Sequence, residues 1–290
     1  MQDTHSTAAH RWMGVLLIVI SAAVFGALPI LTRLAYRAGA DPPTVLLLRY
    51  AIAAVVMVVI VVARKTPLPR GRILFGLILM GAVGYVGQSL AYFTALTLAS
   101  ASLVALLLYL YPAIVTMLSA LFFKERLTPV KLGALLLALV GTALTIGPMG
   151  SGRVPGILLA LAAAVIYSGY ILVGSRLIPH ANAIGASTTV IAAAAVVYTG
   201  IVAVRGPLFP HTLLGWGAVV AIALVSTVLS IVTFFAGLER IGPSKASTLS
   251  TLEPVVSVGL AILILGEALN PLQVLGGVLI LCAVLICSVT

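Results

Sequence analysis

Two ionisable side chains, Arg49 and Glu253, lie inside long apolar stretches of the sequence. A charge in the hydrocarbon core of a bilayer costs roughly 2.5–3.5 kcal/mol on insertion scales, so such a residue faces the protein interior or a water-filled cavity. Glu253 has two open interpretations. It carries protons, or it is a structural group that accepts hydrogen bonds from Ser250 and Ser257 or pairs with Arg49. Arg49 is either a cavity-facing cation or an anchor whose long stem reaches the membrane surface.

Polar and aromatic side chains share one face of a predicted helix at Tyr85, Gln88 and Tyr92. Their spacing of i, i+3 and i+7 places them together on that face. Hydroxyl, amide and aromatic groups suit an amphipathic solute better than lipid. Further candidates for substrate contact, also inside apolar stretches, are Tyr109, Tyr111, Tyr167, Tyr170, Ser230, Ser250 and Glu253. For each one alone interhelical packing is the alternative, but as a set they predict a cavity.

Three prolines, Pro29, Pro112 and Pro254, lie inside apolar stretches. A proline within a helix leaves the carbonyl four residues earlier without its usual partner, which for Pro254 is the carbonyl of Ser250. In a membrane such a group survives only where protein or a water-filled cavity satisfies it. We therefore expect hinges or kinks at these positions. A static kink packed against its neighbours is the alternative.

The elements that must position these residues follow from the composition. The chain has 290 residues, of which 62% are apolar and 8% charged, with a formal net charge of +10. A soluble protein has about 25% charged residues, roughly three times the fraction in this chain. Much of the surface of the chain is therefore expected to face lipid. A soluble enzyme and a secreted disulfide scaffold are excluded. The positive charge is scattered and not gathered into a stripe, which argues against nucleic acid as a partner.

Apolar stretches long enough to cross a bilayer need about 20 residues each. On this basis the sequence predicts an all-α membrane protein with ten transmembrane helices, near residues 12–34, 43–63, 73–96, 100–122, 129–147, 155–177, 183–204, 212–237, 244–265 and 270–288. Eleven Lys and Arg residues fall at the N-terminus and in the loops that follow the even-numbered predicted helices. Four fall in the loops that follow the odd-numbered helices. The positive-inside rule then predicts both termini in the cytoplasm.

The two halves of the sequence resemble each other at an offset of 142 residues. Pro112, Glu125 and Pro129 align with Pro254, Glu267 and Pro271 in this register. The repeats are expected at residues 1–148 and 149–290, each with five helices. An odd number of helices inverts the second repeat in the membrane. Inverted repeats are typical of secondary transporters, whose substrate site lies near the midplane at the repeat interface.

These features resemble the EamA family of the drug/metabolite transporter superfamily, and within it the YddG-type amino-acid exporters. The motifs that carry the resemblance are Leu48-Arg49-Tyr50, Tyr92-Phe93-x-Ala95-Leu96 and Leu252-Glu253-Pro254 through Gly266-Glu267. The resemblance implies a ten-helix fold and export of amino acids or related metabolites. In the second half Glu253 precedes Pro254, whereas in the first half Tyr111 precedes the equivalent Pro112. A carboxylate therefore precedes the proline in one half only.

The function expected is alternating-access export of aromatic or neutral amino acids, or related small metabolites, across a bacterial inner membrane. The expected partners are this small-molecule substrate and the lipid bilayer, with no obligate protein partner. An exporter of lipophilic drugs or bases is the alternative, because Arg49 is the sole candidate cation for an anion site. A membrane-embedded enzyme is a remote alternative, because all four histidines lie in predicted tails or loops. A channel fits bent inverted repeats less well, and no cofactor or metal site is expected.

Overall fold

The computed structural model describes residues 2–123, 128–146, 152–177, 181–241, 249–250 and 252–289, and within these ranges the regular elements are helices. An isolated bridge pairs Ala99 with Gly152. The α-helices are α1 (Gln2–Gly26), α2 (Leu28–Arg37), α3 (Pro42–Ala63), α4 (Gly71–Leu79), α5 (Val86–Leu98), α6 (Ala101–Leu108), α7 (Tyr111–Phe123), α8 (Pro129–Ile146), α9 (Val154–Leu177), α10 (Ala183–Arg205), α11 (Leu213–Ala223), α12 (Ser230–Ile241), α14 (Leu252–Leu265) and α15 (Pro271–Val289). Two π-helical segments are η1 (Met80–Tyr85) and η3 (Leu224–Leu229). The all-α prediction is confirmed.

Short polar side chains begin several of these helices. Asp41 accepts the backbone N–H of Thr44 at the start of α3, and Asn182 and Thr212 cap α10 and α11 in the same way. Ser100 caps α6 directly after α5 has ended at Leu98. Each cap satisfies a backbone N–H that has no partner within its helix. The predicted break between the helices near 73–96 and 100–122 is confirmed.

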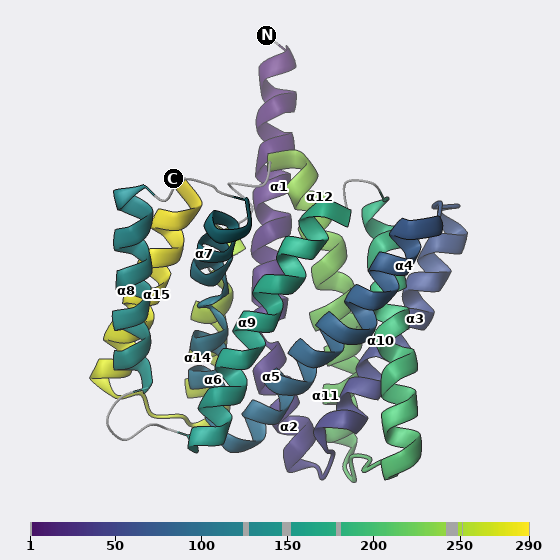
Figure 1. The fold of residues 1–290 in the computed structure, drawn as a ribbon. Helices are drawn as coiled ribbons and strands as arrows, with labels where there is room; N and C mark the ends of the chain where they lie inside the picture. Colours follow the sequence, from purple (N-terminus) through teal and green to yellow (C-terminus); the bar gives the residue numbers. More distant parts are fainter. Residues whose placement is uncertain are drawn as a thin grey trace.

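The first helix differs from its predicted start at residue 12. It begins at Gln2 and extends well beyond the rest of the bundle (Figure 1). The first ten residues contain no proline or glycine, so the helix continues past the apolar stretch.

Two of the three prolines mark places where a helix restarts. Pro29 is the second residue of α2 and Pro112 the second of α7. Pro254 lies in α14 three residues after position 251, which is outside the described residues, and residues 249–250 before that position are also helical. Proline is tolerated in a first turn because its missing N–H has no intrahelical partner there. The stretches expected as single helices at 12–34 and 100–122 are therefore interrupted, at Ala27 and at Tyr109–Leu110.

The two π-helical segments were not predicted from the sequence. They continue α4 into α5 and α11 into α12, and they fall at nearly the same place in the two halves when the sequence is shifted by 142 residues. Isolated π-helical turns inside α-helices are frequent at functional sites.

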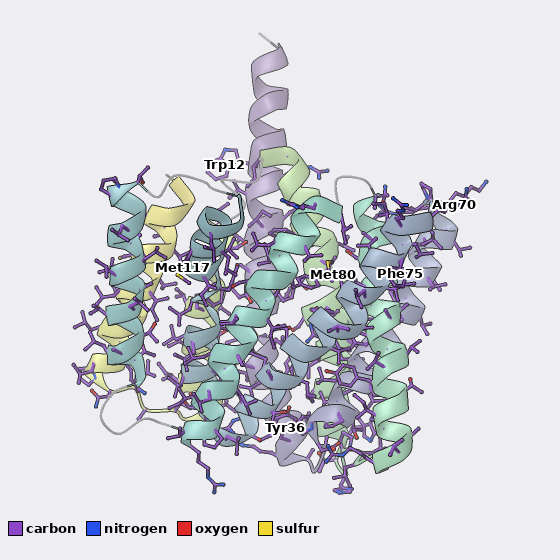
Figure 2. All side chains as sticks on the ribbon, viewed as in Figure 1. Trp12, Tyr36, Arg70, Phe75, Met80 and Met117 are labelled. Carbon is purple, nitrogen blue, oxygen red and sulfur yellow. The ribbon has the colours of Figure 1, made fainter. Side chains whose placement is uncertain are left out.

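The outer surface of the bundle is apolar. Phe75 is 70% exposed and Met117 is 50% exposed (Figure 2). Among the described residues six helices are long and apolar enough to cross a membrane, and four shorter apolar helices span Ala101–Val115, Leu132–Thr145, Leu252–Leu265 and Pro271–Ile286. The chain is a membrane protein, while the count of ten crossings stays a prediction.

Helices from the two halves pack against each other throughout the bundle (Figure 1). The pairs are α1 with α12 and α14, α2 with α11, α3 with α10, α5 with α9, and α8 with α15. In the last pair the backbones approach so closely at Gly141 and Gly276 that a Cβ on either glycine would clash. Both α1 and α15 have their free ends at the same end of the bundle (Figure 1). The inversion of the second repeat stays a prediction.

Candidate functional site

A cavity lies where the interrupted helices meet in the middle of the bundle. It has a volume of about 100 Å³ and is lined, among the described residues, by Phe25, Leu28, Pro29, Arg49, Tyr85, Gln88, Ser89, Tyr92, Phe93, Ala105, Leu108, Tyr109, Tyr111, Tyr167, Glu253 and Ser257. Space for a water molecule needs about 10–15 Å³ on this measure, so the cavity holds several. The lining mixes aromatic rings with hydroxyl, amide and charged groups.

Tyrosine rings form a continuous arc around this cavity. Seven of the nine tyrosines contact one another in the order Tyr198, Tyr50, Tyr85, Tyr170, Tyr167, Tyr111, Tyr109, with ring centroids 4.8–5.9 Å apart. Pairs at this separation add about 0.5–1.5 kcal/mol each beyond their burial. The arc joins helices of the first half to α9 and α10 of the second. Four of its members, Tyr85, Tyr109, Tyr111 and Tyr167, line the cavity and supply much of its aromatic surface.

Arg49 lies against Tyr50, near one end of the arc, and is not a surface anchor. Its side chain is 3% exposed, and its Nε–H donates to the Thr227 hydroxyl at 2.9 Å. The guanidinium lies 5.1 Å from the ring centre of Tyr50 and 5.5 Å from that of Phe93. Thr227 belongs to η3 and donates its own proton to the Ile222 carbonyl at 2.8 Å, so its lone pairs face the arginine. The anchor interpretation is therefore wrong.

Glu253 occupies the other end of the arc. It lies in the first turn of α14, is partly buried and faces the cavity beside the Tyr109 hydroxyl. The pairing with Arg49 left open by the sequence is not formed: Arg49 contacts Thr227, Tyr50 and Phe93, and none of its contacts in the described part of the chain is a carboxylate.

Hydroxyl groups satisfy the backbone where the helices are interrupted. The Tyr109 hydroxyl donates to the carbonyl of Ser250, the group that Pro254 deprives of its partner, at 3.5 Å. At the break between α1 and α2, the Ser257 hydroxyl donates to the Gly26 carbonyl at 2.9 Å. Each of these bonds joins one half of the chain to the other.

A second pair of hydroxyl hydrogen bonds joins the last two turns of α1 to η3 and α12. Ser226 donates to the Val24 carbonyl at 2.6 Å, and Ser21 donates to the Ser230 carbonyl at 2.8 Å. Uncompensated carbonyls are costly in lipid, so these contacts keep the irregular backbone inside the protein.

The model of the EamA-like transporter family matches this chain twice, at residues 12–147 and 154–289. The chain belongs to the EamA-like transporter family. It is therefore a membrane transporter and not an enzyme. The two matches cover almost the whole chain and leave a short connection between them.

Curated relatives of this EamA protein are also named as transporters. The uncharacterized transporter YcbK of Bacillus subtilis is 28% identical over 91% of this chain and 88% of its own length. The aromatic amino acid exporter YddG of Ancylobacter novellus is 34% identical, over 48% of this chain and 50% of its own length. A crystal structure of another protein, 24% identical, covers 94% of this chain and 95% of its own with a TM-score of 0.67, and shows the same fold.

Most of the residues predicted for the site of this EamA protein lie together, and some do not. The cavity lining includes the predicted Tyr85, Gln88, Tyr92, Tyr109, Tyr111, Tyr167, Glu253 and Pro29. Tyr170 stands behind the lining, between Tyr85 and Tyr167. Ser230 is fully buried and donates to the Thr227 carbonyl, while Ser250 contributes its carbonyl to Tyr109. Pro254 is buried but outside the lining, and the side chain of Pro112 lies outside the described residues.

Several lining residues were not in the predicted set. The sequence indicates Arg49 only as one of two alternatives, a cavity-facing cation or an anchor, and Ser257 only as a hydrogen-bond donor to Glu253. Ser89 and Phe93 flank the Gln88–Tyr92 stripe, and a wider stripe around that face would have included them. Glu125, which the repeat comparison aligns with Glu267, lies outside the described residues.

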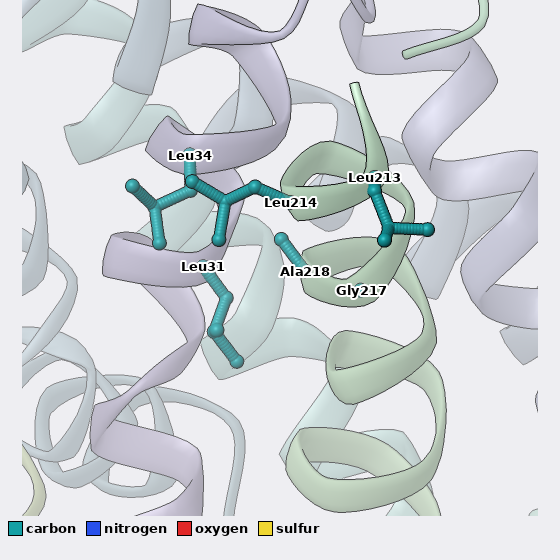
Figure 3. Close-up of a pocket in the computed structure, with 6 residues that line it drawn as sticks. All are labelled: Leu31, Leu34, Leu213, Leu214, Gly217 and Ala218. Atoms are coloured by element: carbon teal, nitrogen blue, oxygen red, sulfur yellow. The ribbon is translucent and has the colours of Figure 1, made fainter. Parts of the chain in front are cut away.

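A second hollow of about 480 Å³ lies between α2 and α11 (Figure 3). Its described lining consists of Leu31, Leu34, Leu213, Leu214, Gly217 and Ala218. None of these side chains can form a hydrogen bond, so the central cavity is the stronger candidate for solute binding. No group of three or more His, Cys, Asp or Glu side chains comes together in the described part of this EamA chain.

Proposed function

We propose that this transporter exports aromatic or neutral amino acids, or related small metabolites, by alternating access across a bacterial inner membrane. The observation that carries the proposal is the tyrosine-lined polar cavity at the junction of the two halves. Small-molecule sites are mostly apolar and aromatic with a few placed polar groups, which matches this lining. The partial likeness to an aromatic amino acid exporter supports the same substrate class.

The helix interruptions supply the movement that alternating access requires. Pro29 is itself part of the cavity lining, and Tyr109 lies in the break between α6 and α7. Transporter sites are typically formed by such discontinuous helices at the interface of internal repeats. We propose that the repeats are inverted and both termini cytoplasmic. Rocking one half against the other then opens the cavity to each side in turn.

Counterflow in proteoliposomes tests the proposal. Vesicles loaded with unlabelled phenylalanine and diluted into a trace of labelled phenylalanine should accumulate label, whereas vesicles without protein should not. A panel of amino acids, organic bases and drugs as competing solutes identifies the substrate class. If no amino acid competes and lipophilic bases do, the amino-acid assignment fails.

The second candidate function is export of lipophilic drugs or bases. Glu253 favours it, because a carboxylate among tyrosine rings attracts an organic cation both by charge and through the faces of the rings. The same counterflow panel separates the two functions.

A further inference from the structure

The lining of the cavity contains one basic and one acidic side chain. Arg49 and Glu253 both line it, and no carboxylate is among the described contacts of Arg49. Arg49 lies on Tyr50 and Glu253 lies beside Tyr109, and these two tyrosines are separated along the arc by four others. The two charged side chains therefore lie beside different members of the tyrosine arc and line the same cavity.

The surroundings of Arg49 fix its position without neutralising its charge. Thr227 is a neutral acceptor, and the faces of Tyr50 and Phe93 attract a cation without providing a full negative charge. A single Nε–H is used by Thr227, while a guanidinium has five N–H donors. The remaining donors form a planar fork, the geometry that matches a carboxylate.

Resting on the proposed function, we propose that Arg49 binds the carboxylate of the transported solute and Glu253 binds its ammonium group. A buried charge without a counter-charge is unfavourable, and an amphoteric solute supplies the missing partner to both ends at once. An amine without a carboxylate neutralises Glu253 and leaves Arg49 unpaired. A carboxylic acid without an amine does the reverse. The pair therefore selects solutes that carry both charges.

Three solutes with the same phenyl group test the assignment: phenylalanine, phenethylamine and 3-phenylpropionate. Each competes for labelled phenylalanine counterflow in vesicles that contain the wild-type full-length chain. Phenylalanine should compete at least tenfold better than either singly charged analogue. A wild-type protein that accepts the amine equally well would overturn the role of Arg49, and equal acceptance of the acid would overturn that of Glu253.

Neutral variants then assign each charge to its end. Arg49→Gln should reduce the preference for phenylalanine over phenethylamine by tenfold or more, because the carboxylate has lost its partner. Glu253→Gln should likewise reduce the preference for phenylalanine over 3-phenylpropionate. Arg49→Lys keeps the charge and should retain most of the preference. Binding of the three solutes to purified protein, measured by thermal shift, gives the same ratios where transport by a variant is slow.

Matched controls neutralise charges outside the cavity. Arg33 is an arginine of α2 that donates to the Leu96 carbonyl and does not line the cavity. Arg33→Gln and Glu267→Gln should leave both preferences unchanged. If the Arg49 and Glu253 variants weaken competition by all three solutes equally, the inference is overturned while amino-acid export stands. If the wild type moves no amino acid, the proposed function itself fails.

Discussion

The Glu267 carboxylate accepts a hydrogen bond from the Ser102 hydroxyl at 2.7 Å, although 165 residues separate them in the chain. It also accepts the backbone N–H groups of Ala101 and Ser102, at 2.8 and 3.1 Å. These are the first residues of α6, so the carboxylate caps a helix that belongs to the other half. Charge-assisted bonds at a helix N-terminus are among the stronger ones in proteins.

Replacing Glu267 by Gln should destabilise the protein by about 1–3 kcal/mol, the usual cost of losing hydrogen bonds to a charged group. Thermal unfolding in detergent measures the change. Ser102→Ala should cost less, because two of the three bonds involve the backbone. In the Glu267→Gln background the Ser102 substitution should add little. Fully additive losses would show that the two side chains do not act together.

Gly26 allows α1 and α14 to approach closely. A Cβ at this position would lie 2.7 Å from the Glu253 carbonyl oxygen and 2.8 Å from the Val256 side chain. Gly26→Ala should therefore cost about 1–3 kcal/mol, as is typical of overpacking, and should reduce counterflow by displacing Glu253. Gly169→Ala is the matched control, since open space surrounds that glycine in α9. Equal stability of the two variants would contradict the close contact.

Gln88 provides an amide on the cavity wall. It is 8% exposed and lines the cavity beside Tyr92. Gln88→Ala should reduce counterflow at least fivefold while leaving expression and thermal stability near the wild-type values. Thr199→Ala is the control, because the exposed Thr199 hydroxyl bonds only within its own helix. Normal transport by Gln88→Ala would mean that this face is packing.

Arg153 and Arg70 lie at opposite ends of the bundle and can be used to test its orientation in the membrane. The Arg153 backbone N–H donates to the Leu98 carbonyl at 2.9 Å, which places it at the same end as the Glu267 cap. Arg70 lies at the opposite end, where α1 begins (Figure 2).

In a background without Cys282 and Cys287, an impermeant maleimide added to whole cells should label Arg153→Cys and not Arg70→Cys. This is the result expected if both termini are cytoplasmic. Labelling after cell lysis provides the control, since both variants should then react. The reverse pattern on intact cells would invert the topology.

The sequence predicted much of the fold because lipid imposes strong rules on it. Apolar stretches located the helices, and Pro29 and Pro112 each located a restart, since a missing N–H acts locally. The polar-aromatic stripe of Gln88 and Tyr92 was also visible from spacing alone. These features depend on short segments of the chain and on the solvent.

The remaining parts of the site depend on contacts between distant segments. Thr227 holds Arg49 from a π-helical turn, and no local sequence rule located that turn. Tyr50 and Tyr198 stack with ring centres 5.6 Å apart from helices in different halves, and neither has a polar residue three or four positions away. The acceptor of the Ser257 hydroxyl, at Gly26, lies 231 residues away. Only the assembled bundle reveals such partners.

The serine bonds to α1 have a consequence for biosynthesis. The first helix enters the membrane early, but the hydroxyls of Ser226 and Ser257 that satisfy its interrupted end are made near the end of translation. Until then the carbonyls of Val24 and Gly26 need water, lipid headgroups or an insertion factor as temporary partners. The nascent chain therefore reaches its native packing only after the second half has been synthesised. A ribosome that stops before residue 257 leaves an unfinished core that quality-control proteases can recognise.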